Sequence, residues 1–174
     1  MSSAADYSVE PRSRADLRVL ARSIRRVLGC ENQLFFPIVE LLDVLEEVLD
    51  GFSYSIIPDE VFPPSKHADI NVYSGEIRIR ESVYEGARHG NGRDRMTIAH
   101  EFSHYITLCL LGFKLNRVIG NDELHAYEDP EWQAKCLAGE LMIPHDLTAG
   151  MNASEIAEKC GVSKSAAKYQ LEKR

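Results

Sequence analysis

A glutamate between two histidines, in the run His100-Glu101-Phe102-Ser103-His104, is the feature of this sequence best suited to chemistry. On a helix, residues four positions apart lie one turn apart on the same face, so both imidazoles can reach one metal ion. Glu101 is rotated by about 100° from His100, where its carboxylate can contact a water on the metal without occupying a coordination position. Zinc lowers the pKa of such a water to about 7, and the glutamate can take its proton as the water attacks a carbonyl. The spacing predicts metal-assisted peptide hydrolysis, although a surface helix with two histidines would show the same five residues.

A catalytic zinc usually has three protein ligands, so a third ligand should follow His104 in the chain. Glu131 is the best placed, because it falls in the first turn of a predicted helix whose apolar face can pack against the first helix. A glutamate there also interacts favourably with the helix dipole without any metal, so the residues alone leave both roles open. The acidic and histidine candidates are Glu123, His125, Glu128, Asp129, Glu131 and Glu140.

Two predicted helices position these side chains. The first should run from Asp94, its candidate N-cap, to Leu111, ahead of Gly112. The second should begin at Pro130 after a capping Asp129 and end near Met142. Between them lies a polar segment, residues 116–129, which we expect to be mobile.

The remaining elements are predicted from hydrophobic periodicity. Apolar residues at helical spacing indicate two upstream helices, and the tail indicates two short helices with a break near Gly161. Alternation and a Ser74-Gly75 turn indicate a hairpin, preceded by one more strand. The glycines at 86, 90 and 92 indicate a flexible stretch before the histidine helix. The helices should cover residues 14–28, 38–49 and 152–173, and the strands residues 52–57, 69–73 and 76–80.

Composition excludes several other classes of protein. The net charge of −7 argues against a protein whose main task is to hold a polyanion. Charge is uneven, because residues 31–60 carry eight acids and no lysine or arginine, whereas residues 12–26 hold six arginines. No apolar run reaches the roughly 20 residues of a membrane span, and residues 1–11 do not read as a signal peptide. We therefore expect a cytoplasmic protein, whose four separated cysteines are reduced and buried.

Two long motifs resemble the ImmA/IrrE family of metallopeptidases. They are IRIRESVYEGARHGNGRDRMTIAHEFSHYITL and, after a short interval, YEDPEWQAKCLAGELMIP. The resemblance extends over roughly residues 14–171 and implies a small zincin-like α+β fold, mostly helical, with a short three-stranded sheet or hairpin beside the HExxH helix. Ser103 stands where many members have glycine, and Phe102 where an aliphatic residue is common.

The resemblance implies a Zn²⁺ site formed by His100, His104 and Glu131, with Glu101 as the catalytic residue. It also implies that an edge strand beside the helix pairs with an extended peptide substrate. The strand expected to do so consists of Glu76, Ile77, Arg78, Ile79 and Arg80. Tyr84 and Arg95 flank the motif in sequence, and either could stabilise an oxyanion or simply pack.

The tail resembles a helix-turn-helix, but its second helix has few side chains suited to base reading, and its net charge is only +2. Packing on the domain, or docking to a partner, is the preferred interpretation, and direct nucleic-acid binding is not expected. The expected organisation is a flexible N-terminus at 1–13, a metallopeptidase domain at 14–150, and a packed helical tail at 151–174.

These inferences predict a cytoplasmic zinc-dependent endopeptidase. The resemblance implies that its substrate is a helix-turn-helix transcriptional repressor of a mobile element or stress response. The alternative is a non-proteolytic regulatory partner, of toxin-antitoxin type or an anti-repressor, that binds a repressor through the same groove. A DNA-binding regulator acting through the tail is a third possibility, which a gel-shift assay would test.

Overall fold

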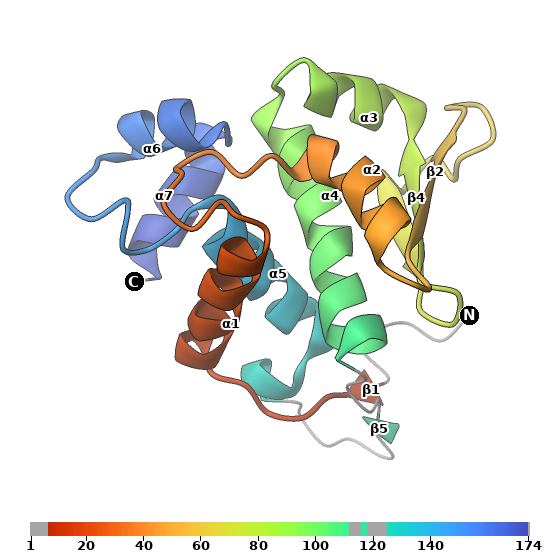
Figure 1. Cartoon of the computed structure of the whole chain (residues 1–174), viewed down its shortest axis with the longest axis horizontal. Helices are drawn as coiled ribbons and strands as arrows, with labels where there is room; N and C mark the ends of the chain where they lie inside the picture. The colour runs from red at the N-terminus through yellow and green to blue at the C-terminus, as the bar shows by residue number, and fades with distance from the viewer. Residues whose placement is uncertain (1–6, 112–115, 118–124, 174) are drawn as a thin grey trace.

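The computed structural model describes residues 7–111, 116–117 and 125–173 of the 174. Within these ranges, seven α-helices accompany a small three-stranded sheet that lies at one side of the molecule, so the expected α+β, mostly helical fold is confirmed (Figure 1). The helices are α1 (Arg14–Val27), α2 (Ile38–Val48), α3 (Glu81–Arg88), α4 (Gly92–His104), α5 (Pro130–Met142), α6 (Ala153–Cys160) and α7 (Lys164–Glu172). The strands are β1 (Tyr7–Ser8), β2 (Ser53–Ile57), β3 (Ala68–Asn71), β4 (Glu76–Arg80) and β5 (Asn116–Arg117), and two short helical segments are π-helical Tyr105–Leu110 and 3₁₀ Ala126–Glu128.

The main sheet is mixed, with strand order β2-β4-β3. β4 runs parallel to β2, with Ile56 opposite Ile79, and antiparallel to β3, with Ile70 opposite Ile77. Ile77 and Ile79 are fully buried, whereas the intervening Arg78 is exposed. One face of the sheet therefore enters the core, where it joins apolar residues of α2, α4 and α5.

Helix α4 lies in the middle of the molecule, between the sheet and α5 (Figure 1). It begins at Gly92, two residues earlier than predicted, because the side chain of Asn91 rather than Asp94 caps it. Beyond His104 the helix continues as the π-helical turn Tyr105–Leu110, where Thr107 donates to the carbonyl of Ser103. The predicted helix therefore exists, with a wider final turn.

The expectation of a flexible stretch around Gly86, Gly90 and Gly92 is corrected, because Gly86 lies in helix α3 and Gly92 begins α4. Gly86 belongs to that helix, and a Cβ atom there would come within 2.0 Å of Asp94 Oδ2. This glycine allows α3 to approach the start of α4 closely. From sequence alone, Gly86 was expected to interrupt a helix, whereas in the structure it lies within one and permits close packing.

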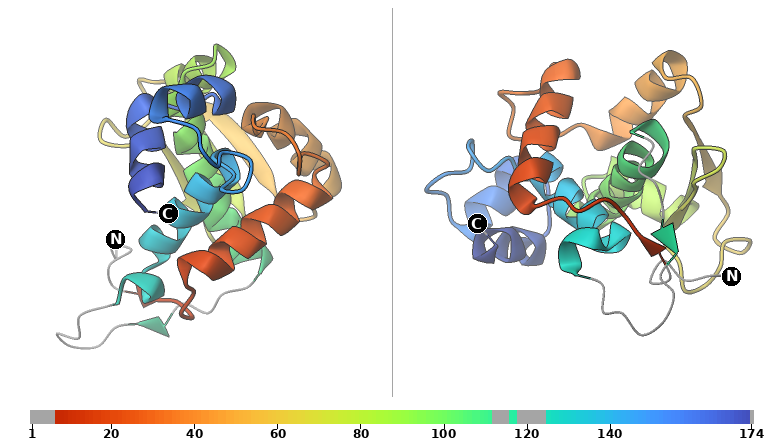
Figure 2. Two further views of the ribbon diagram at one scale, coloured as in Figure 1. Left: turned by 90° about the vertical axis from the view of Figure 1, so that its left-hand side faces the viewer. Right: turned by 90° about the horizontal axis from the view of Figure 1, so that it is seen from below.

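The C-terminal helices α6 and α7 pack onto the domain. Gly161, which ends α6, has the left-handed conformation at φ 65°. Its carbonyl accepts a hydrogen bond from Arg95 Nε (2.9 Å), and the same guanidinium donates to the carbonyl of Phe36 (2.7 Å). Figure 2 shows the two helices beside α5, away from the sheet. One buried arginine of α4 thus binds both the turn between α6 and α7 and the segment before α2.

The N-terminal segment is attached from residue 7 onward. Tyr7–Ser8 pairs with Asn116–Arg117, and the amide of Val9 donates to the carbonyl of Glu128 (2.8 Å). The expectation of a flexible segment at 1–13 is therefore wrong for residues 7–13, and residues 1–6 lie outside the described part. No helix in the described ranges has the length and apolar character that crossing a membrane requires.

Candidate metal centre

The last turn of α4 and the first turn of α5 bring His100, His104 and Glu131 together. Nε2 of His100 lies 3.2 Å from Oε2 of Glu131, and Nε2 of His104 lies 3.2 Å from Oε1 of the same carboxylate. The two imidazole rings are nearly perpendicular, at 86°, with centroids 4.7 Å apart. Both histidines thus direct the same nitrogen toward one carboxylate.

Local sequence explains why Glu131 is held at this position. Asp129 is the N-cap of α5, and its side chain accepts a hydrogen bond from the amide of Glu131 (2.9 Å). Pro130 occupies the first helical position, where its missing amide hydrogen costs nothing. The start of α5 is therefore fixed within one residue of the carboxylate, as the sequence predicts.

Burial decreases across the cluster from one histidine to the carboxylate. The side chain of His104 is 7% exposed, that of His100 27%, and that of Glu131 50%. Nδ1 of His104 is buried and has no hydrogen-bond partner among the described residues. The cluster is therefore anchored in the core on one side and accessible to solvent on the other.

The two carboxylates of the site have opposite pKa shifts. Hydrogen bonds with His100 and His104 hold the pKa of Glu131 well below its ordinary range. Burial raises the pKa of Glu101, and the nearby histidines only partly oppose that effect. Glu131 is thus stabilised as a carboxylate, while Glu101 is poised to take up a proton.

These residues fit a metal ion of the zinc type. Two nitrogens and one oxygen, each from a different side chain, lie within 4.8 Å of one another. Ligands about 2.1 Å from a tetrahedral zinc are about 3.4 Å apart, and the two measured nitrogen–oxygen separations are close to that value. The donor set of two imidazoles and one carboxylate, with one side open, suits a catalytic rather than a closed structural site.

The other candidates for a third ligand are engaged elsewhere, or lie outside the described part of the chain. His125 and Glu128 form a capping box on the 3₁₀ turn, and Asp129 caps α5. Glu140 is buried and bonded to Arg18 and Gln170. Glu123 falls within residues 118–124, which are not described.

The prediction that Glu76, Ile77, Arg78, Ile79 and Arg80 pair with a substrate is wrong. These residues form β4, the central strand, so β2 and β3 already occupy the hydrogen-bonding groups on its two sides. The edge on the α4 side is β3. Its Asp69 is close enough to Glu101 to influence that pKa, and Arg78 holds it through two hydrogen bonds of 2.8 Å. Alternation within residues 76–80 revealed a strand, but it carried no information about neighbours.

Arg95 and Tyr84, which could either stabilise an oxyanion or simply pack, both make packing contacts in the structure. The guanidinium of Arg95 is buried, bonded to two carbonyls and stacked 3.8 Å from the ring centroid of Phe35. Tyr84 stacks on Tyr54, with ring centroids 6.3 Å apart. Arg95 is therefore a packing residue.

Comparisons with known proteins agree with this geometry. The family model of the IrrE N-terminal-like domain, peptidase family M78, matches residues 61–172. The chain belongs to this family of zincin-like peptidases.

A solved structure described as a Mycobacterium tuberculosis transcriptional regulator has the same fold, with a TM-score of 0.59 over 91% of this chain at 14% identity. The chain corresponds to 46% of that longer protein. The search of curated proteins found no match.

Proposed function

We propose that this protein is a zinc-dependent endopeptidase that cleaves a partner protein at a specific site. The carrying observation is the convergence of His100, His104 and Glu131, with Glu101 one position along the same helix. Membership in a peptidase family supports this reaction class. In the proposed assignment, the two histidines and Glu131 hold the metal, and Glu101 is the catalytic residue.

Zinc held by these three residues would polarise the scissile carbonyl and lower the pKa of a water molecule to about 7. Glu101 acts as general base, taking the proton of the attacking water at its carboxylate and then delivering it to the leaving amine nitrogen. Burial favours this role, because a desolvated carboxylate binds a proton more readily than an exposed one. Glu131 keeps its negative charge between the two histidines throughout.

The substrate-binding edge in this proposal is β3, at Ala68–Asn71. An extended peptide can add to an edge strand through main-chain hydrogen bonds, and this edge lies beside α4. The partner we propose is a helix-turn-helix repressor in the cytoplasm, as the family resemblance implies. We also propose that residues 14–150 carry the peptidase chemistry and that residues 151–174 support it by packing.

Metal content tests the first half of this proposal. Mass spectrometry of chelator-free protein should find about one zinc per wild-type chain, and much less in His104→Ala and Glu131→Ala. Glu101→Gln is the matched control, because it alters a carboxylate of the same helix turn that is not a ligand. Absence of metal from wild-type protein, even after zinc is added, would contradict the assignment.

Cleavage is tested in cells that express either wild-type protein or Glu101→Gln. Mass spectrometry of protein N-termini should find one or a few new termini with wild type and none with the variant, since loss of a general base costs about 10²–10⁴ in rate. New termini in many unrelated proteins would contradict the narrow specificity. Repressor release by both forms would instead establish the non-proteolytic binding partner.

A further inference from the structure

A cavity of about 330 Å³ lies between α1 and the end of α5. Four arginines of α1 line it, at positions 18, 22, 25 and 26, together with Glu140 and the segment Pro144–Leu147. Glu140 is nine residues after Glu131, which places this cavity about 13 Å further along the axis of α5 than the metal ligand. It is a different site from the candidate metal centre.

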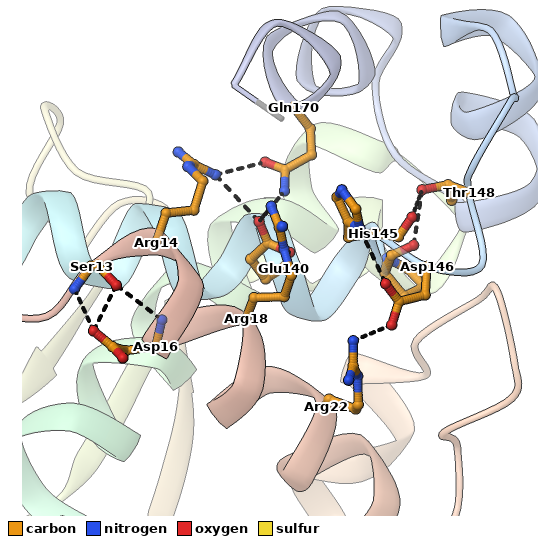
Figure 3. Close-up of polar contacts among 11 residues, drawn as sticks. Ser13, Arg14, Asp16, Arg18, Arg22, Glu140, His145, Asp146, Thr148 and Gln170 are labelled. Atoms are coloured by element: carbon orange, nitrogen blue, oxygen red, sulfur yellow. Dashed lines mark hydrogen bonds and ion pairs between the residues drawn. The ribbon is translucent and has the colours of Figure 1, made fainter.

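The arginines of this region outnumber the carboxylates. Figure 3 shows Arg14 and Arg18 reaching Glu140, and Arg22 reaching Asp146. Arg26 pairs with Glu31 (2.7 Å). Including Arg25, five guanidinium groups thus face three carboxylates, and two positive charges remain uncompensated in a chain whose overall charge is −7.

Arg25 is the arginine of this group that has no carboxylate among its described contacts. It is 1% exposed and donates to the carbonyls of Leu141 and Gln33. Its Nε is buried without a hydrogen-bond partner among the described residues. A buried charge without a counter-charge is costly, so an anion in the cavity that it lines would relieve that cost.

The outer ion pairs can exchange partners. The side chains of Arg22 and Arg26 are 48% and 64% exposed. Exposed pairs of this kind contribute little stability, because water and salt screen them. Their guanidinium groups are therefore available to bind a ligand oxyanion through two parallel hydrogen bonds.

We propose that this cavity binds a small molecule carrying two or more phosphate or carboxylate groups. Its volume is about ten times the 30 Å³ that one water occupies in the liquid, so it exceeds what a single inorganic ion needs. The arginines are spread over about two helical turns, which suits two separated anionic groups. The lining residues include no Phe, Tyr or Trp, so the cavity offers no platform for stacking a nucleobase.

Calorimetric titration with fructose 1,6-bisphosphate tests the phosphate form of this ligand, and succinate tests the carboxylate form. Uncharged fructose is the ligand control, and sodium chloride keeps the ionic strength equal. We expect one molecule of either probe to bind saturably per chain, weakened about tenfold by Arg22→Gln or by Arg26→Gln. Arg88→Gln, which removes an equally exposed paired arginine from α3, should leave the affinity unchanged. Arg25 itself is not substituted, because that change would also remove hydrogen bonds that hold α1 to α5. Arg22 and Arg26 are chosen instead because their ion pairs are exposed.

Three results would overturn the proposal. The first is no saturable binding of either probe to folded wild-type protein. The second is equal weakening by Arg88→Gln, which would indicate attraction by overall charge alone. The third is binding that is lost in His104→Ala but kept in Arg22→Gln and Arg26→Gln, which would place the probe at the metal centre.

Discussion

Glu101 and Glu131 are chemically the same side chain, yet their surroundings give them opposite tendencies to hold a proton. Hydrogen bonds with two imidazoles keep Glu131 ionised, whereas burial makes ionisation of Glu101 less favourable. Pairs of titratable groups whose pKa values are pushed apart commonly divide the roles of an active site between them. Here, the division agrees with the roles that we propose, Glu131 as metal ligand and Glu101 as general base.

Asp69, on the edge strand β3, should make the stability of the sheet depend on pH. Burial raises the pKa of Asp69, but hydrogen bonds from Arg78 and Lys66 outweigh burial and leave the pKa below its ordinary value. A carboxyl group whose pKa is lower in the folded than in the unfolded state stabilises the fold at any pH above its unfolded pKa, which is about 3.9 for Asp. This stabilisation is lost as the pH falls through the folded-state pKa. Asp69→Asn should therefore lower the free energy of unfolding at pH 7 by on the order of 1 kcal/mol.

Urea unfolding of wild type and Asp69→Asn checks this prediction. The difference between the two proteins should begin to shrink below about pH 4, where Asp69 of the unfolded chain binds a proton, and disappear once the folded carboxyl is protonated too. Asp59→Asn is the control, because the Asp59 carboxylate accepts a hydrogen bond from the amide of Ser82 and does not pair with Arg78. It separates loss of the ion pair between Asp69 and Arg78 from a general loss of negative charge. A difference that is constant across the pH range would contradict the ionic role of Asp69.

At the scale of elements, α4 and the tail meet at Gly92. A Cβ atom at this position would come within 2.3 Å of the carbonyl carbon of Val162 and 2.5 Å of the amide nitrogen of Ser163. Because both are backbone atoms, neither can move without shifting the turn between α6 and α7. Helix propensity alone predicts that Gly92→Ala is stabilising by up to about 1 kcal/mol, so the packing and the propensity predict opposite signs.

We expect Gly92→Ala to lower the free energy of unfolding by about 1–3 kcal/mol, as overpacking does. Thermal and urea unfolding measure the effect, with Arg93→Ala at the next, exposed position as the control. A Gly92→Ala protein as stable as wild type would show that the tail does not rest against α4 in solution.

The sequence predicts well those helix ends that are determined by residues directly beside them. The Asp129-Pro130 pair fixes the start of α5, and Gly161 fixes the end of α6. The errors concern partners distant in sequence. Alternation within β4 could not reveal that β2 would pair with its second side, and nothing local linked Arg18 to Glu140, which is 122 residues away. The histidine pair of the candidate metal centre was predictable from its spacing on one helix, whereas Glu131 was one of several candidates until the family resemblance favoured it.

At the scale of the whole molecule, a bound metal would join α4 to α5. A ligand that binds only the folded state stabilises it, by about 4 kcal/mol at a thousandfold excess over its Kd. For a chain of this length, that corresponds to a rise in Tm of about 8–16 °C. Removing the metal with a chelator should therefore lower the Tm of wild type and Glu101→Gln equally. Calorimetric melting of His104→Ala should show no chelator effect, and an effect of the same size there would indicate a metal bound elsewhere.

The buried carboxylate of Glu140 also has a consequence for the order in which the protein matures. It accepts hydrogen bonds from Arg14 (3.4 Å), Arg18 (3.0 Å) and Gln170 (2.9 Å), so residues near both described ends close around one side chain of α5. On a ribosome, residue 170 emerges long after residue 131, and until then α5 lacks part of its support. The packing around α5, the helix that carries Glu131, should therefore be completed only after residue 170 has emerged.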